Sequence, residues 1–322
     1  MNSMSATRGQ HWAQINESSF VAGMRLLFWI CRYFGRWPFR AVLYPMMVWY
    51  MIAKPAARQA SIDYLRRIAA TGCVSGIKAG NVTVLRHFAS FGESILDKML
   101  LWSGLFNAER VVFYGQQQVV AETVAKRGAL LICPHLGNLD LCRVLAKNLP
   151  GFKMTLLIHT KHAKTFNRML AQLDPASQAD VMQVTELSAA TAIVLAEKIS
   201  RGEFIVISGD RIPVSAKPRV AFVNFLGALA PFPVGPYILA SLLQCPTYLL
   251  FSMRAGRISE VHFELFRETI RLPRRGREEA LTRLTAEYAA RLEHFCLRAP
   301  LQWFNFYDFW DLPAVDVTHA SR

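Results

Sequence analysis

The sequence has little negative charge for its length. Its 322 residues include 23 Asp and Glu against 37 Lys and Arg, which leaves a formal net charge of +14. The chain also lacks the residue spacings of a zinc finger, a P-loop or a dinucleotide-binding turn. A basic surface suits an anionic partner such as nucleic acid, an acidic membrane or an acidic protein. Because the basic residues are scattered among Trp, Phe and Met, the pattern favours a membrane surface, and no nucleic-acid partner is expected.

Cysteine is scarce as well, and none of the six cysteines belongs to a C-x-x-C pair. Most of them sit in apolar runs, which predicts buried and reduced thiols. Reduced thiols fit a protein that faces the cytosol. The first 19 residues are polar and lack the pattern of a signal peptide, so 1–19 are expected to form a flexible N-terminus.

The aromatic segment that follows lacks a long uncharged run. Its longest one, 41–53, contains Pro45 and is shorter than the roughly 20 residues that a membrane-spanning helix needs. Arginines alternate here with bulky apolar residues, which is typical of helices that lie in the membrane interface. A helix pair packed on the domain and a tilted span are the alternatives. Residues 20–55 are therefore predicted to form a membrane-associated helical anchor.

From residue 111 onward, strand-like and helix-like patterns alternate. Strands are predicted at 111–114, 129–133, 154–158, 181–184, 204–208, 219–225, 246–252 and 260–266, and helices at 117–126, 138–148, 163–173, 187–200, 233–243 and 277–297. This alternation predicts an α/β fold with a central, mostly parallel or mixed sheet flanked by helices. One domain is expected over 56–310, with a helical N-terminal part, and a tail over 311–322.

One stretch, 128–144, combines a buried strand with a polar turn. Pro134 ends the strand because it has no N–H to donate, and His135 follows at the strand end. Asn138 is a good N-cap for the next helix, and Asp140 lies in the first turn of that helix. The pattern predicts a histidine beside a carboxylate above the sheet. The alternative is a strand-end histidine that bonds a capping aspartate and performs no chemistry.

A histidine beside a carboxylate can act as a general base. The carboxylate fixes the tautomer of the ring and stabilises the imidazolium that forms. The chain has no recognisable serine or cysteine nucleophile: the G-E-S stretch at 92–94 lacks the closing glycine of a nucleophile elbow, because Leu96 stands there. An acceptor hydroxyl would therefore be the attacking group.

Other charged positions are weaker candidates for a site. The Gly-Asp-Arg turn at 209–211 follows a predicted strand, and Asp210 and Arg211 could bind a phosphate or position a headgroup. An ordinary Asp–Arg turn pair is the alternative. Arg219 adds positive charge nearby in the sequence.

The remaining histidines do not suggest a metal site. His159 and His162 flank Lys161, and a two-residue gap suits a metal only with further ligands that the sequence does not show. His87 lies on a predicted amphipathic helix and is expected to be structural.

The HLGNLD stretch at 135–140 matches the H-x4-D/E signature of glycerolipid-type acyltransferases and follows a GxLLxxP-like strand. In this form the sequence most resembles the bacterial lipid A late acyltransferases, the lauroyl and myristoyl transferases. The GDR turn, the RVAFVNFLG strand and the PFPVGPYILA helix start extend the resemblance over most of the chain. The WFNFYDFW end at 303–310 stands where that family typically has a basic stretch, so a sibling branch acting on aryl polyene or ornithine lipids is the alternative.

The resemblance implies an acyltransferase on the cytoplasmic face of a bacterial inner membrane. It implies transfer of a fatty acyl group from an acyl carrier protein thioester to a lipid hydroxyl, with His135 as general base and Asp140 orienting it. No cofactor, metal or covalent intermediate is expected. Substrate-binding roles are expected for Gly137, Asn138, Lys161, Asp210, Arg211 and Arg219. Backbone N–H groups near Gly137 or a basic side chain would stabilise the oxyanion. The basic surface would meet the acidic carrier protein.

Two rival functions use the same residues differently. A thioesterase or hydrolase would activate water with the same histidine and carboxylate. A non-catalytic membrane scaffold would keep the fold without needing His135.

Overall fold

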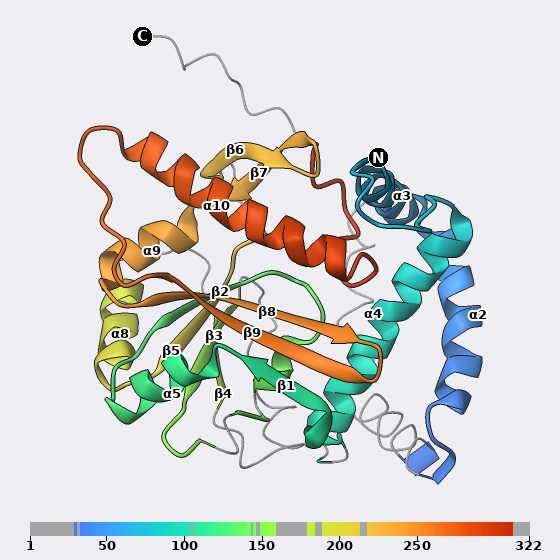
Figure 1. Ribbon diagram of the computed structural model, residues 1–322, viewed down its shortest axis with the longest axis horizontal. Coiled ribbons are helices and arrows are strands. Elements are labelled where there is room, and N and C mark those ends of the chain that lie inside the picture. The colour runs from blue at the N-terminus through green and yellow to red at the C-terminus, as the bar shows by residue number, and fades with distance from the viewer. Residues whose placement is uncertain are drawn as a thin grey trace, which may run out of the picture.

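The computed structural model describes residues 29–30, 33–102, 104, 106–142, 144–145, 149–158, 179–183, 189–212 and 218–311. Its architecture is mixed α/β, with a central, mostly parallel sheet flanked by helices (Figure 1). This fold class is the one that the alternating sequence pattern predicts. The expected flexible start over 1–19, the helix over 163–173 and most of the tail over 311–322 lie outside the described residues.

The central sheet has seven strands in the order β1-β9-β8-β2-β5-β3-β4. Their bounds are β1 Val111–Tyr114, β2 Leu130–Cys133, β3 Met154–Ile158, β4 Ala179–Gln183, β5 Phe204–Ser208, β8 Thr247–Ala255 and β9 Ile258–Arg267. Strands β2, β3, β4, β5 and β8 are parallel, whereas β9 is antiparallel to β8 and parallel to β1. The carboxyl ends of β2, β5 and β8 therefore share one edge with the amino ends of β9 and β1. We call it the elbow edge.

Helices cover both faces of this sheet. They are α5 Gln116–Val124, α8 Ala189–Ser200, α9 Gly235–Leu243 and α10 Arg277–Arg298. Leu130 and Ile132 of β2 belong to the apolar cluster that includes residues of α8, α9 and α10, while Leu131 and Cys133 belong to the cluster that includes Val119 of α5. Burial on both faces explains why β2 is a continuous apolar run instead of an alternating one.

A separate hairpin, β6 Val220–Phe225 and β7 Ala228–Pro233, contacts α10. The sequence analysis predicts β6 but not β7, in which Pro231 and Pro233 cannot donate to a ladder of hydrogen bonds. A two-stranded ribbon tolerates them, since each strand has a free edge. The turn consists of Leu226 and Gly227, both in the left-handed region with φ 51° and 78°, as a two-residue hairpin turn requires.

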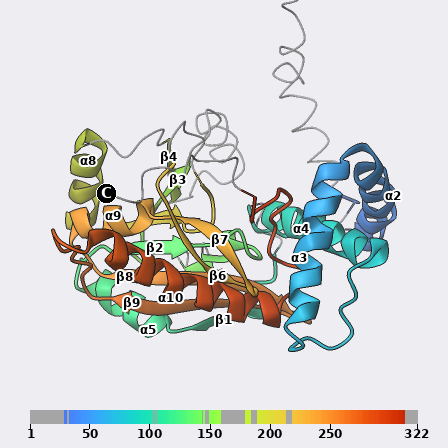
Figure 2. The same ribbon diagram turned by 90° about the horizontal axis from the view of Figure 1, so that it is seen from above.

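Three helices, α2 Trp37–Ala53, α3 Pro55–Ala70 and α4 Asn81–Trp102, are grouped at one end of the sheet (Figure 2). The buried Leu43 of α2 packs directly against Gly92 of α4, where a Cβ atom would clash with it. Arg36 and Arg40 add ion pairs to Glu93 of α4. One face of α2 is therefore packed on the domain, which is the arrangement that the alternative of a packed helix pair predicts.

The opposite face of α2 is apolar and exposed. Trp37, Val42, Trp49 and Ile52 are each more than 60% exposed. Within the described part of the chain, no helix combines the length and the apolar character that crossing a membrane requires.

Candidate functional site

Strand register brings His135 and Asp210 together. Strands β2 and β5 are parallel neighbours, and Cys133 at the end of β2 pairs with Ser208 at the end of β5. His135 and Asp210 each follow two residues later, so both lie above the elbow edge. His135 Nδ1 is 2.8 Å from Asp210 Oδ1. The ring and the carboxylate thus come from two separate strand ends.

Asp210 is buried and accepts several hydrogen bonds. The backbone N–H of His135 donates to Oδ2 at 2.8 Å, the Trp303 indole N–H donates to Oδ2 at 2.9 Å, and the Ser208 hydroxyl donates to Oδ1 at 2.9 Å. Burial alone would raise the pKa of Asp210, but the charges of His135 and Arg211 and the hydrogen bonds from His135 hold it below its usual value. Asp210 is therefore ionised at neutral pH.

An ionised Asp210 can only accept a hydrogen bond from the ring. We therefore place a proton on Nδ1 of His135, and in the neutral ring this tautomer leaves Nε2 as the acceptor. The His135 side chain is 46% exposed, and none of the described residues hydrogen-bonds Nε2. The exposed nitrogen can take a proton from a bound hydroxyl group, while Asp210 stabilises the imidazolium that results.

The prediction that Asp140 orients His135 is not met, because Asp210 is the partner of Nδ1. The carboxylate of Asp140 forms an ion pair with Lys98 of α4, with 3.1 Å between Nζ and Oδ2. Its backbone N–H is capped by the Asn138 side chain at 3.2 Å, in a short 3-10 helix, Leu139–Leu141. Residues 134–140 form the turn after β2, which we call the elbow, and Asp140 thus links the elbow to α4.

The position of Gly137 is fixed by its backbone conformation, by a close contact and by two hydrogen bonds. Its φ of +64° favours glycine, and a Cβ atom there would lie 2.1 Å from the carbonyl oxygen of Ser252. Its N–H donates to the Gln302 carbonyl at 2.9 Å, and its own carbonyl accepts from the Ser94 hydroxyl at 3.1 Å. Because the Gly137 N–H already has this partner, the predicted oxyanion donor would be another N–H near Gly137 or a basic side chain.

The segment after α10 packs against the elbow and Asp210. The sequence analysis gives this segment no role in the site. Trp303 is fully buried, forms an isolated bridge with Leu136 and reaches Asp210 through its indole. The Phe304 N–H donates to the His135 carbonyl at 2.8 Å. We call residues 302–305 the strap. It holds the backbone of the elbow and one oxygen of Asp210 at the same time.

Two other candidates also have structural partners. The Arg211 guanidinium donates to the Asn305 side chain at 2.7 Å and to the Phe304 carbonyl at 2.8 Å, so it fixes the strap. Arg219 forms an exposed ion pair with Glu278 at 2.9 Å. Lys161 lies outside the described residues, as do His159 and His162.

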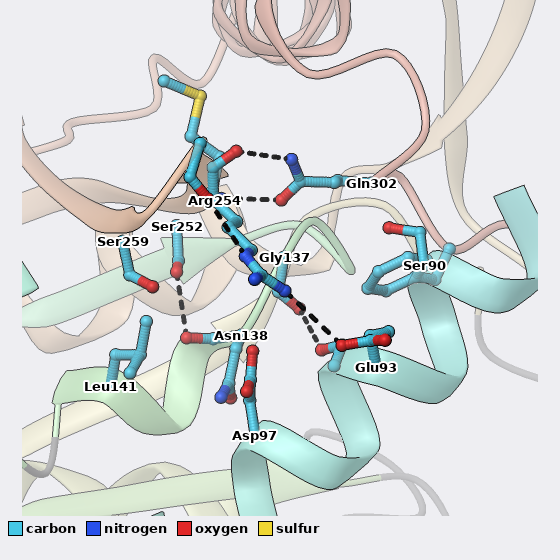
Figure 3. A pocket seen from close by; sticks show the side chains of 14 residues that line it. Ser90, Glu93, Asp97, Gly137, Asn138, Leu141, Ser252, Arg254, Ser259 and Gln302 are labelled. Atoms are coloured by element: carbon cyan, nitrogen blue, oxygen red, sulfur yellow. Dashed lines mark hydrogen bonds and ion pairs between the residues drawn. The ribbon is translucent and has the colours of Figure 1, made fainter. Parts of the chain in front are cut away.

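Asn138 differs from these residues because one of its polar atoms has no partner. Its side chain is buried, and its Nδ2 lacks a hydrogen-bond partner among the described residues. Asn138 lines a cavity of about 180 Å³ beside the elbow, together with Ser94 and Asp97 of α4 and Arg254 of β8 (Figure 3). Figure 3 shows Arg254 reaching across this cavity toward Glu93. A polar ligand or water could bond the free amide of Asn138 there.

The cysteines near the elbow do not form a nucleophile. Cys133 and Cys142 are buried, and burial raises the pKa of both thiols above the usual value. Neutral buried thiols are inert. His87 is structural, as predicted: it is buried and bonds Ser61 and the Trp303 carbonyl, both at 2.9 Å.

Comparison with known proteins places this site in context. A family model described as bacterial lipid A biosynthesis acyltransferase matches residues 86–311. The matched segment includes the elbow, Asp210 and the strap. The comparison with curated proteins gave no match.

Proposed function

Because the chain belongs to the bacterial lipid A biosynthesis acyltransferase family, we propose that it transfers a fatty acyl group from a carrier thioester to a hydroxyl group of a lipid. The observation that carries the chemistry is the His135–Asp210 pair with its exposed Nε2. This pair needs no residue of the chain to become acylated, which agrees with the inert thiols beside it.

The reaction proceeds in two proton transfers through Nε2 of His135. Nε2 takes the proton of the acceptor hydroxyl while that oxygen attacks the thioester carbonyl. The tetrahedral intermediate collapses, its C–S bond breaks, and the thiolate leaves with the proton that Nε2 returns. Asp210 stabilises the imidazolium between the two transfers, and Asp140 acts as a positioning residue by fixing the elbow to α4.

The donor in this proposal is an acyl carrier protein. Its acidic surface suits a chain with a net charge of +14. No metal or organic cofactor is part of the proposed reaction. Lys161, Asn138 and Arg211 remain the proposed groups near the substrate, of which Asn138 has a free donor and Arg211 acts through the strap.

The acceptor in this proposal is a lipid A precursor, as the matched family suggests. The chain would reach it at the cytoplasmic face of the inner membrane, with the exposed apolar face of α2 lying in the membrane interface. Aryl polyene and ornithine lipid acceptors are the alternatives, because the chemistry of the site requires only a hydroxyl group.

The test is a comparison of lipid extracts by mass spectrometry. Cells with the wild-type protein are compared with cells that carry His135→Ala, which removes the base and keeps the other elbow contacts. The expected result is lipid A that lacks one acyl chain in the variant. A change confined to another lipid would show that this lipid, and not a lipid A precursor, is the acceptor. Identical lipid profiles would contradict the proposal. Release of free fatty acid without transfer, in a purified assay with the acceptor lipid present, would support the hydrolase instead.

A further inference from the structure

A second cavity, of about 450 Å³, lies beside the cavity of Figure 3 and shares Arg254 with it. Its lining is rich in arginine and includes Arg36, Arg110, Arg254 and Arg257. Among the described residues that line it, Asp97 is the only carboxylate. We call this cavity, with its four arginines, the arginine pocket.

The topology places the arginine pocket at the elbow edge, which is also the end of the strands that His135 follows. Arg254 lies near the end of β8, Arg257 directly precedes β9, and Arg110 directly precedes β1. Strand β9 is two positions from β2 in the sheet order. At the usual strand spacing this separates the two strands by about 10 Å sideways. Along the strand direction, the register places Arg254 four residues beyond the level of Cys133.

The arginine pocket has an excess of positive charge. Arg36 forms ion pairs with Glu93 and Asp97, and Arg254 lies 3.6 Å from Glu93. These carboxylates hold two of the guanidinium groups in place.

The other two arginines are free to bind a ligand. Arg110 and Arg257 are exposed, and no ion pair joins either of them to a residue that the structure describes. Even with Glu93 counted, four guanidinium groups face two carboxylates, which leaves two positive charges.

We propose that the arginine pocket binds a phosphate monoester on the headgroup of the acceptor lipid. A phosphate monoester carries about 1.5 to 2 negative charges at pH 7 and three acceptor oxygens, which match this excess of charge and its guanidinium donors. The two cavities share Asp97, Arg254 and Ser259, and the first one is lined by Gly137, two residues from His135. A headgroup that spans both cavities would hold its phosphate in the arginine pocket and bring another part near His135. This inference rests on the proposed function, because it concerns the acceptor of that reaction.

The experiment measures binding, so its readout does not depend on acyl transfer. Short-chain phosphatidic acid, a phosphate monoester, and short-chain phosphatidylglycerol, a phosphodiester, are titrated separately into the full-length protein, and inorganic phosphate is titrated as well. The variant is Arg110→Gln/Arg257→Gln. The control is Arg274→Gln/Arg275→Gln, which removes the same charge from the exposed loop before α10, at the opposite edge of the sheet.

The wild type and the control are expected to bind phosphatidic acid at least about tenfold more tightly than phosphatidylglycerol, because charge-assisted bonds to a dianion are the stronger ones. The Arg110→Gln/Arg257→Gln variant is expected to lose this preference. Circular dichroism verifies that the variant is folded.

Three results would overturn the inference. The wild type binds both lipids equally, the variant keeps the preference, or the wild type binds inorganic phosphate as tightly as phosphatidic acid, which would indicate a site for free phosphate. Transfer assays on the same samples separate this inference from the proposed function. A protein that transfers acyl groups without the lipid preference refutes only the arginine pocket.

Discussion

At the scale of single residues, the site depends on which carboxylate His135 bonds. Asp210 meets the ring at Nδ1, whereas the acidic residue of the H-x4-D pattern, Asp140, forms an ion pair with Lys98. The two aspartates therefore have different roles that a pair of matched substitutions can separate. Each substitution replaces a carboxylate with an amide of the same size.

Asp210→Asn is expected to reduce kcat by about 10²–10⁴, because the amide cannot stabilise the imidazolium of His135. Asp140→Asn is expected to reduce kcat by less than about tenfold, because it weakens only a partly exposed ion pair. Single-turnover transfer assays on both variants measure the difference. A larger loss of kcat for Asp140→Asn than for Asp210→Asn would show that Asp140, and not Asp210, supports His135 in the reaction.

At the scale of elements, most strands are predictable from the sequence, because each is an apolar run bounded by turn residues. The pairing of β2 with β5 is not predictable, because strands far apart in the sequence become neighbours only through the order of the sheet. That pairing is what places Asp210 opposite His135. A weak signal exists, since both residues stand two positions beyond the end of a buried strand.

The strap is harder to foresee for a related reason. Trp303 follows α10 in an aromatic segment that has no strand or helix period, and its partners Leu136, His87 and Asp210 are far away in the sequence. The helix predicted over 138–148 begins instead as a 3-10 turn. The bond between the Asn138 side chain and the Asp140 N–H explains the correct prediction of the cap.

The contact between α4 and the strap has a pH-dependent stability. Burial lowers the pKa of His87 from 6.5 to about 4, although its bond to the Trp303 carbonyl works in the opposite direction. The unfolded chain therefore binds a proton on this histidine between pH 6.5 and about 4, while the folded chain does not. Stability from this group is complete above pH 6.5 and falls as the pH is lowered through that window.

Between pH 7 and pH 5, His87 is expected to cost the wild type about 2 kcal/mol of unfolding free energy. His87→Gln is less stable at pH 7, because it disturbs the bonds to Ser61 and Trp303, but it loses less stability between the two pH values. Urea unfolding of both proteins at both pH values measures the two differences. Equal losses in both proteins would show that other groups dominate the acid sensitivity.

At the scale of the whole molecule, α2 and α4 lie at the end of the sheet toward which the elbow edge faces (Figure 1). In the proposed function, the exposed apolar face of α2 would lie in the membrane interface, and the acceptor would reach the elbow from that membrane. In that proposal the net charge of +14 would act in the same direction, because a basic surface is attracted to anionic lipids.

The triple variant Trp37→Ser/Trp49→Ser/Ile52→Ser tests whether this face of α2 binds the membrane. These side chains are exposed, so their loss leaves the packing of α2 on α4 intact. Burying one large apolar side chain contributes roughly 1.5–3 kcal/mol. Even half of that from each residue predicts at least about tenfold weaker binding to anionic vesicles in a flotation assay.

The matched control is Val124→Ser/Ile193→Ser/Leu229→Ser, which removes three equally exposed apolar side chains from α5, α8 and the β6–β7 hairpin. Vesicle binding of the control should equal that of the wild type if α2 alone enters the interface. Equal loss in the two triple variants would show that binding depends on general surface hydrophobicity. Unchanged binding in both variants would show that the basic surface, and not α2, binds the vesicles. The salt concentration needed to release the protein would then measure that electrostatic attraction.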